Sequence, residues 1–295
     1  MSKRPLRSTV KRLVPAPARK VVRRAATYFG RLRIWRSVAA EIDGATPRDE
    51  RILRTARRRG CWTAFRDLDL WQDPHLPEDA TVTIPGIGRF HVRAMTDDLY
   101  HVLPSREMHV VSAVRANLGE GSTFVDAGAN IGFFTVLAAG IVGRTGRVYA
   151  IEMMPRTADR LRLNIAENGF TNIAVLEHAL SAKSGEEVLA TVPEHKFGRA
   201  SIVNDADGEP HSTISVRTRT IDELLGESDG PIDLMKLDLE GAEALALKGA
   251  TEVLKRVRAI IFEQLRGESE ASVLLEQSGF RLSWLDGNNF LAVRD

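Results

Sequence analysis

The chain of 295 residues is 43% hydrophobic and 27% charged, which is typical of a large globular domain with an appendage and excludes a disordered or fibrous protein. The only cysteine, Cys61, excludes an intrachain disulfide and a multi-cysteine metal site and fits a reducing, cytoplasmic compartment. No uncharged apolar run of 18 residues and no apolar signal-peptide segment is present, so we expect no transmembrane helix and no secretion signal.

The net charge of +2 hides an uneven distribution along the chain. Residues 1–60 contain 18 Lys and Arg and 4 Asp and Glu, whereas the remainder contains 23 and 35. This separation predicts a basic N-terminal extension (1–60) and an acidic body. Within the body we expect N-terminal strands and a helix (61–121), followed by the core domain (122–295).

Residues 19–40 of the extension have the pattern of an amphipathic helix. Apolar residues recur there at spacings of three and four, namely Val21, Ala25, Tyr28, Leu32, Trp35 and Ala39. Such a helix can pack on its own body or on a second subunit, lie on an anionic membrane surface, or neutralise nucleic-acid phosphates. The membrane alternative would place the protein at the inner membrane surface, and the acidic body disfavours nucleic acid.

A polar helix is expected at residues 49–59, two short strands at 81–95 and a helix from Ser105 to Gly119. From residue 122 strands and helices alternate, which predicts an α/β fold whose parallel sheet carries helices on both faces. The strands are expected at 123–128, 147–153, 173–180, 232–241 and 259–265, and the helices at 131–143, 156–169, 242–256 and 269–279. A short turn joins the last two strands, 281–285 and 290–294, so these must be antiparallel.

A strand-rich insertion, residues 183–220, interrupts this alternation after the third strand. A long excursion at the carboxyl side of a sheet is more often a lid or binding loop than a linker. Lys196, Arg199 and Ser201 lie within it and could contact a sugar or a phosphate-bearing acceptor, although a solvated loop is the simpler interpretation.

The loop after the first core strand has the pattern D-x-G-x-N-x-G, formed by Asp126, Gly128, Asn130 and Gly132. It lacks the G-x-G-x-x-G spacing of a dinucleotide site, and the acid would repel a diphosphate, which disfavours a nicotinamide oxidoreductase. S-adenosylmethionine suits the loop better because it carries an ammonium, a sulfonium and a carboxylate. We expect Asp126 to accept hydrogen bonds from the amino group, Gly128 to permit close backbone approach, and the next helix N-terminus to hold the carboxylate.

Two further strand ends carry groups that suit the same cofactor. Glu152 ends the second core strand, 20 residues after Gly132, where an acid can accept hydrogen bonds from both ribose hydroxyls. His178 and Ala179 close the third strand and are expected to contact the adenine.

The segment DAGANIGFFT, together with RTIDEL, KLDLEGAE and ALKGA further along, resembles the FkbM family of class I S-adenosylmethionine-dependent methyltransferases. The resemblance covers roughly residues 84–295 and leaves the basic extension outside. It implies a Rossmann-like, seven-stranded, mostly parallel sheet with an antiparallel last strand. It also implies O-methylation, commonly of sugar hydroxyls in glycolipids, polysaccharides and natural products, so the expected acceptor is a small-molecule or glycan hydroxyl.

Three charges, Lys236, Asp238 and Glu240, alternate along a central strand that should be nearly all apolar. We interpret Asp238 as the base that accepts the acceptor's hydroxyl proton, Glu240 as an orienting group and Lys236 as the partner of Asp238 or of a developing alkoxide. The alternative is a structural ion pair followed by a helix N-terminal acid.

Other groups could also serve the transfer site. Glu263 could line the acceptor pocket, and His178, His195 or His211 could act as base instead of Asp238. No metal is expected, although Asp238, Glu240 and Glu263 could together hold a divalent ion. The alternative function is an RNA-directed methyltransferase or a nucleic-acid-binding protein that uses the basic extension.

Overall fold

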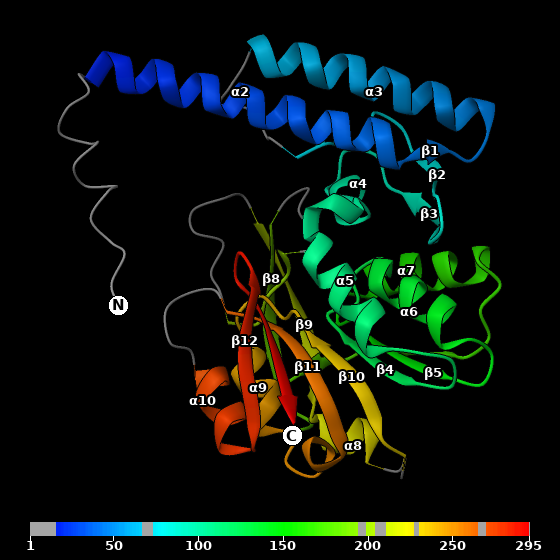
Figure 1. The fold of residues 1–295 in the computed structure, drawn as a ribbon, viewed down its shortest axis with the longest axis vertical. Helices are drawn as coiled ribbons and strands as arrows, with labels where there is room; N and C mark the ends of the chain where they lie inside the picture. Colours follow the sequence, from blue (N-terminus) through cyan, green and yellow to red (C-terminus); the bar gives the residue numbers. More distant parts are fainter. Residues whose placement is uncertain are drawn as a thin grey trace.

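The computed structural model describes residues 16–66, 73–193, 199–203, 211–226, 230–264 and 270–294. At its centre is one seven-stranded sheet, whose order is β12-β13-β11-β10-β4-β5-β6 (Figure 1). The strands are β4 (Thr123–Ala127), β5 (Arg147–Ile151), β6 (Ile173–Leu176), β10 (Ile232–Leu237), β11 (Val257–Glu263), β12 (Phe280–Asp286) and β13 (Asn289–Arg294). Neighbouring strands from β11 to β6 pair in parallel, whereas β13 is antiparallel to both of its neighbours, so the predicted sheet is confirmed.

Helices cover both faces of the sheet because successive strand residues point to opposite sides. On one face Phe124, Leu234 and Ile261 share a buried cluster with residues of α5 (Met108–Asn117) and α6 (Phe133–Val142). On the other face lie Val125 and Met235, in a cluster with α8 (Ile221–Leu225), α9 (Glu243–Lys248) and α10 (Glu270–Gln277). The remaining core helix, α7 (Pro155–Glu167), packs beside β5 and β6.

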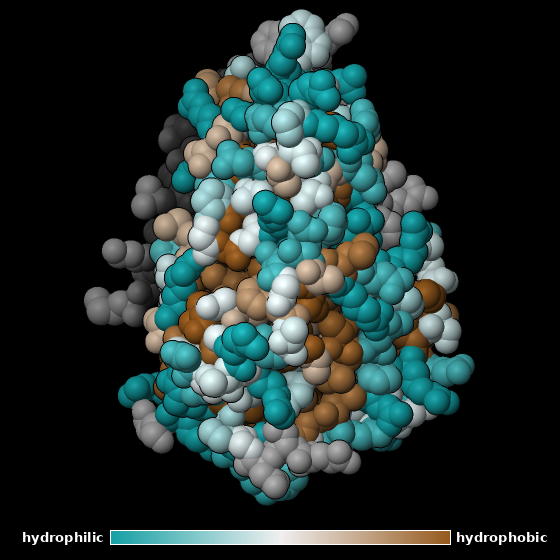
Figure 2. Space-filling view, turned by 90° about the vertical axis from the view of Figure 1, so that its right-hand side faces the viewer, coloured by the Kyte–Doolittle hydropathy of each residue, from teal (hydrophilic) through white to brown (hydrophobic). Residues whose placement is uncertain are grey.

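The edge strand β6 ends the sheet on one side, and all four of its residues are apolar and half-buried. Figure 2 views the molecule from the right-hand side of Figure 1, where β5 and β6 lie. Apolar side chains gather in the lower half of this face, whereas hydrophilic ones dominate its upper part.

The N-terminal part forms a helical hairpin and a small sheet above the core (Figure 1). The hairpin consists of α2 (Ala16–Glu41) and α3 (Pro47–Arg66). The predicted strands pair as the hairpin β2 (Ala80–Ile84) and β3 (Gly88–Val92), and β1 (Asp43–Gly44) pairs with β2. Between this sheet and α5 lie α4 (Asp98–His101) and the 3₁₀ turn η1 (Pro104–Glu107), so the helix expected from Ser105 begins as a 3₁₀ turn. Within the described ranges, no helix is both long and apolar enough to cross a bilayer.

Only part of the predicted apolar stripe of α2 is exposed. Trp35 is 7% exposed and lies against Gly60 of α3, where a Cβ atom would meet its indole ring. Val38 and Ile42 are buried in the same cluster as the core sheet. The C-terminal half of α2 therefore packs on the protein's own body, which is the first of the alternatives that the sequence pattern left open.

The insertion contributes a second small sheet of β7 (Ala179–Leu180), β9 (His211–Arg219) and β8 (Glu187–Pro193). The strand-rich character expected for the insertion is confirmed, because β8 and β9 form an antiparallel pair. The single strand expected at residues 173–180 is instead divided into β6, in the central sheet, and β7, which pairs with β9. His195 and Lys196 lie outside the described residues.

The helix expected at residues 242–256 is interrupted. It ends after Lys248, with Gly249 as its C-cap packed closely on the carbonyl of Ser181, and the chain resumes as the 3₁₀ turn η3 (Val253–Arg256). Asp222 of α8 holds this restart by accepting hydrogen bonds from the backbone N–H groups of Glu252 and Val253.

Candidate active site

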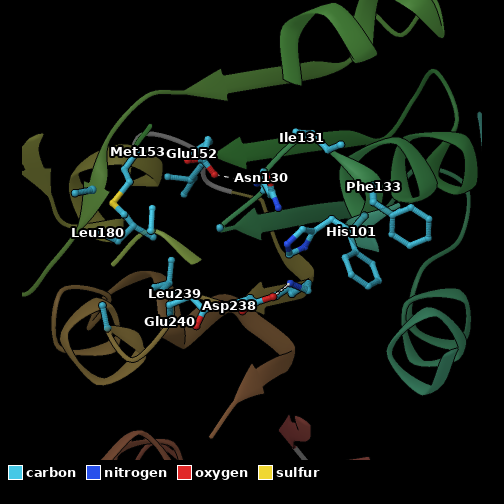
Figure 3. Close-up of a pocket in the computed structure, with 18 of the residues that line it drawn as sticks. His101, Asn130, Ile131, Phe133, Glu152, Met153, Leu180, Asp238, Leu239 and Glu240 are labelled. Carbon is cyan, nitrogen blue, oxygen red and sulfur yellow. Dashed lines mark hydrogen bonds and ion pairs between the residues drawn. The ribbon is translucent and has the colours of Figure 1, made fainter. Parts of the chain in front are cut away.

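Most of the predicted catalytic and cofactor-binding residues surround one cavity at the carboxyl ends of the parallel strands (Figure 3). Its walls come from the β4–α6 loop, the end of β5, the β6–β7 connection and the β10–α9 loop. Three further segments complete it, namely α4 with η1, the start of α6, and residues 200–202 of the insertion. Open α/β sheets bind ligands at this edge, so the architecture marks the cavity as the candidate site.

The β4–α6 loop reaches the cavity through Gly128 and Asn130. Gly128 has a φ of +84°, and a Cβ there would lie 1.9 Å from the carbonyl oxygen of Asp238, so a glycine is needed to pack this loop on β10. Asn130 also has a positive φ, +50°, which is strained for a non-glycine residue. Its side-chain Oδ1 is buried and has no hydrogen-bond partner within the described residues.

Glu152 lies at the end of β5 and faces the cavity. Its Oε2 accepts a hydrogen bond from the Asn130 N–H at 2.9 Å (Figure 3), and its Oε1 accepts one from the Met154 N–H at 2.9 Å. Burial raises the pKa of Glu152 to about 7, although both N–H groups favour the carboxylate. The carboxyl group therefore fixes the glycine loop against β5 and remains beside the ligand space.

Asp126 and Gly132 do not line this cavity. Asp126 is 1% exposed, and its Oδ2 accepts a hydrogen bond from Thr135 Oγ1 at 2.6 Å. Burial raises the pKa of Asp126, and its Oδ1 has no partner in the part of the chain that the structure describes. Gly132, with a φ of +94°, precedes α6 and packs against Leu161 of α7.

The expected adenine side is formed by His178 and Ala179, which both line the cavity beside Met153 and Leu180. Burial lowers the pKa of His178, and the neighbouring Arg219 lowers it further, so its imidazole is neutral at pH 7. An apolar wall with a neutral ring suits a flat heterocycle.

Lys236 and Asp238 form an ion pair on the floor of the cavity, with Nζ 2.8 Å from Oδ2 (Figure 3). The Lys236 ammonium also lies 4.8 Å above the centre of the Phe134 ring. Burial by itself would raise the pKa of Asp238, but the charge and hydrogen bond of Lys236, together with the charge of Arg106, outweigh it and lower that pKa. Asp238 is therefore a carboxylate at neutral pH, with Oδ2 held by Lys236.

Asp238 and Glu240 do not alternate along a strand as predicted, because β10 ends at Leu237. Glu240 has a φ of +50° and begins the turn into α9. The expected N-terminal acid of that helix is Glu243, whose Oε1 accepts hydrogen bonds from the N–H groups of Leu239 and Gly241. Glu243 therefore fixes the loop, and Glu240 is left to line the cavity.

The carboxyl groups of Asp238, Glu240 and Glu263 converge, and one oxygen of each lies within 4.8 Å of the others. Burial and the charges of the other two acids raise the pKa of Glu240 to about 8. Burial and Asp238 raise the pKa of Glu263 to about 7. At neutral pH this cluster therefore combines the ionised Asp238 with a mostly protonated Glu240 and a Glu263 near its midpoint, and a protonated carboxyl group can donate as well as accept hydrogen bonds.

The sequence reasoning missed His101 and Arg106, which also line the cavity. His101 Nε2 lies 3.1 Å from Asp97 Oδ2, and its Nδ1 lies 2.9 Å from Arg106 Nη1. Because a guanidinium only donates, Nδ1 accepts there and Nε2–H donates to Asp97. Arg106 also pairs with Glu107 at 3.1 Å. The Asp97–His101 spacing of four within DDLYH was the only sequence signal for this network.

The insertion reaches the cavity through Ala200 and Ile202. Ser201 is 2% exposed, and its Oγ donates a hydrogen bond to the carbonyl of Glu240 at 2.9 Å. Arg199 is exposed. Ser201 therefore attaches the insertion to the β10–α9 loop.

These residues fit S-adenosylmethionine. The cavity-lining cations Arg106 and Lys236 are each paired with an acid, and the carboxyl groups of Glu152 and Glu240 line the same cavity. The buried Oδ1 of Asn130 adds an unsatisfied acceptor. An acidic, acceptor-rich cavity suits a ligand with ammonium, sulfonium and hydroxyl donors and opposes a diphosphate.

Comparisons with known proteins agree with this arrangement. The family model described as Methyltransferase FkbM domain matches residues 126–293. The hexuronic acid methyltransferase AglP of Haloferax volcanii is 27% identical over 198 residues, which cover 66% of this chain and 78% of AglP. Methyltransferase sdnD of Sordaria araneosa is 30% identical over 204 residues, with 57% of this chain and 77% of sdnD covered.

Solved structures are more distant. A SAM-dependent O-methyltransferase from Thermotoga maritima superposes with a TM-score of 0.42 and 13% identity, covering 72% of this chain and 77% of that chain.

Proposed function

The chain belongs to the FkbM methyltransferase family and is an S-adenosylmethionine-dependent methyltransferase, and on this premise we propose that it methylates a sugar hydroxyl in a glycolipid, glycan or natural product. The observation that carries the proposal is the convergence, in one cavity, of the glycine loop, Glu152 and the Lys236–Asp238 pair.

The cofactor supplies a methyl group on a positively charged sulfur, and this chain would hold it through the walls described above. Glu152 would accept hydrogen bonds from the ribose hydroxyls, and His178 and Ala179 would contact the adenine. Asn130 and the N-terminus of α6 would bind the amino acid end. Asp126 would act from behind the loop, through its buried charge or through a water molecule, because it does not line the cavity.

Asp238 would receive the proton of the acceptor hydroxyl as the hydroxyl oxygen bonds to the methyl carbon; the carbon–sulfur bond would break in the same step, with its electron pair left on the sulfur. Lys236 holds Oδ2 and leaves Oδ1 to accept this proton. The lowered pKa makes Asp238 a weak base, so positioning of the hydroxyl would supply much of the acceleration. His101 is the second candidate base; its Nδ1 would have to release Arg106 first.

A sugar acceptor is supported by the acids around Asp238 and by one relative. Glu240 and Glu263 offer carboxyl groups that can both donate and accept hydrogen bonds, which suits adjacent hydroxyls on a ring. The relative AglP is named for methylation of a hexuronic acid. Glu240 would orient the acceptor, as the sequence predicted.

The proposal is tested by methyl incorporation from labelled cofactor into separate pools of glycans, glycolipids and RNA. We expect label in a sugar-containing pool with the wild type and none with Asp238→Asn. Label confined to RNA would contradict the sugar assignment, and full turnover by Asp238→Asn would remove Asp238 as the base.

Cofactor contacts are tested separately by calorimetry. Loss of a charge-assisted hydrogen bond corresponds to a tenfold to hundredfold weaker affinity, by rough estimate, which we expect for Asp126→Ala and Glu152→Ala. Unchanged affinity in both variants would contradict the assignment of this wall to the cofactor.

A further inference from the structure

The α2–α3 hairpin carries large apolar side chains that face solvent. Val22 is 64% exposed, Phe29 65% and Trp62 61%. None of the three belongs to the predicted stripe, whose Trp35 is buried; Phe29 lies beside the stripe, roughly 80° around α2 from its centre. Tyr28 and Phe29 pack edge to face, with ring centres 5.4 Å apart.

A groove between the two helices joins these aromatic residues to a row of arginines. Its lining consists of Tyr28, Thr55, Cys61 and Trp62 together with Arg54, Arg57, Arg58 and Arg59. No acid lines it within the described residues, and the nearby Glu50 lies 3.4 Å from Arg54. The groove therefore combines four positive charges with aromatic rings.

We propose that this groove and its rim dock on an anionic phospholipid bilayer, with Phe29 and Trp62 entering the interface and the arginines contacting phosphate groups. Interfacial helices have this composition, with a basic face and aromatic or aliphatic residues that enter the headgroup region. Charge complementarity selects this occupant over a second copy of the chain, because a symmetric pairing of this face would bring arginine onto arginine. A nucleic acid would use the charges but would leave the aliphatic Val22 without a role.

The hairpin is connected to the candidate active site. Glu41, the last residue of α2, accepts a hydrogen bond at 2.9 Å from the N–H of Ser105, the neighbour of Arg106. Figure 1 places α2 and α3 above α4, on the side toward which the parallel strands point. Docking would thus bring the cavity toward the lipid surface, where it could reach a membrane-anchored acceptor. The choice of such an acceptor rests on the proposed function, whereas the docking itself does not.

The test is flotation of the full chain with vesicles of phosphatidylcholine alone and of phosphatidylcholine with about a third phosphatidylglycerol. We expect binding to the anionic vesicles, weakened by salt, and little binding to the neutral ones. Each arginine near an anionic surface contributes about fivefold, so Arg54→Gln/Arg58→Gln/Arg59→Gln should bind about a hundredfold more weakly. The tryptophan emission of the wild type should shift to shorter wavelength with anionic vesicles. This shift should be absent in Trp62→Phe.

Matched controls come from exposed residues elsewhere in the chain. Arg115→Gln/Arg144→Gln/Arg147→Gln removes the same charge, and Trp284→Ala removes another exposed indole, so both should bind like the wild type. Equal binding of the two triple variants would overturn the proposal. So would wild-type binding that is indifferent to lipid charge, binding to RNA but not to vesicles, or a lipid-free dimer that buries Trp62. Vesicle binding needs no turnover, so its failure would leave the proposed reaction untouched.

Discussion

The ion pair of Lys236 and Asp238 gives the sharpest test of how the cavity floor is held together. The Lys236 side chain is 5% exposed and that of Asp238 is 26% exposed, with 2.8 Å between the charged atoms. Asp238→Asn would leave the Lys236 ammonium buried without its partner. Removing one member of a buried pair destabilises by about 3–5 kcal/mol, and we expect a value near 3 because Glu107 and Asp126 still favour the charge of Lys236.

The double variant Lys236→Met/Asp238→Asn separates this explanation from a simple loss of packing. Removing both charges leaves no buried ion. The double variant should therefore recover at least half of the free energy of unfolding that Asp238→Asn loses. Lys236→Met alone should cost less than Asp238→Asn, because Asp238 is more exposed and retains Arg106 nearby. Urea unfolding followed by circular dichroism at pH 7 measures all four chains. A double variant whose loss equals the sum of the two single losses would refute the reasoning.

Three further outcomes are expected. Burial raises the pKa of Glu152 from 4.5 to about 7, so the folded state binds the Glu152 proton more tightly than the unfolded state does. The stability that this proton contributes is fully present below pH 4.5 and is lost as pH rises through 7. The expected loss is roughly 3 kcal/mol. Urea unfolding at pH 5 and pH 8 should show this loss in the wild type relative to Glu152→Gln, and parallel behaviour of the two chains would contradict it. Gly128→Ala should destabilise by about 2 kcal/mol more than the control Gly169→Ala, since both have positive φ but only Gly128 meets a carbonyl oxygen; equal melting curves would argue against the clash. Asn164→Ala should cost about 2–4 kcal/mol in chemical unfolding, because its side chain accepts from the His91 N–H and donates to the Ile131 carbonyl; a loss below 1 kcal/mol would show that water replaces it.

Much of the fold could be predicted because its signals are local. Alternating apolar strands and amphipathic helices from residue 122 onward predicted the order of the core elements, and a short turn allowed only an antiparallel final pair. The strand-end positions of Glu152, His178 and Asp238 followed from that order, because parallel strands bring their carboxyl ends to one edge.

The conformations of the loops that follow the strands could not be predicted from the sequence pattern. Glu240 and Glu243 are both acids near the start of α9, and only the positive φ at Glu240 and the N–H groups near Glu243 decide which one caps the turn and which lines the cavity. Asp126 similarly occupies a strand end, but its rotamer directs it to Thr135 and away from the cavity surface.

The sequence by itself determined the α/β order, the glycine loop and the acidic strand ends, because periodicity and turn chemistry act over a few neighbouring residues. Only the tertiary structure brought His101 and Arg106 to the cavity, buried Trp35 and exposed Phe29 with Trp62. Those outcomes depend on which surfaces pack together from distant parts of the chain. A helical pattern indicates that one face is apolar but does not indicate which element covers that face.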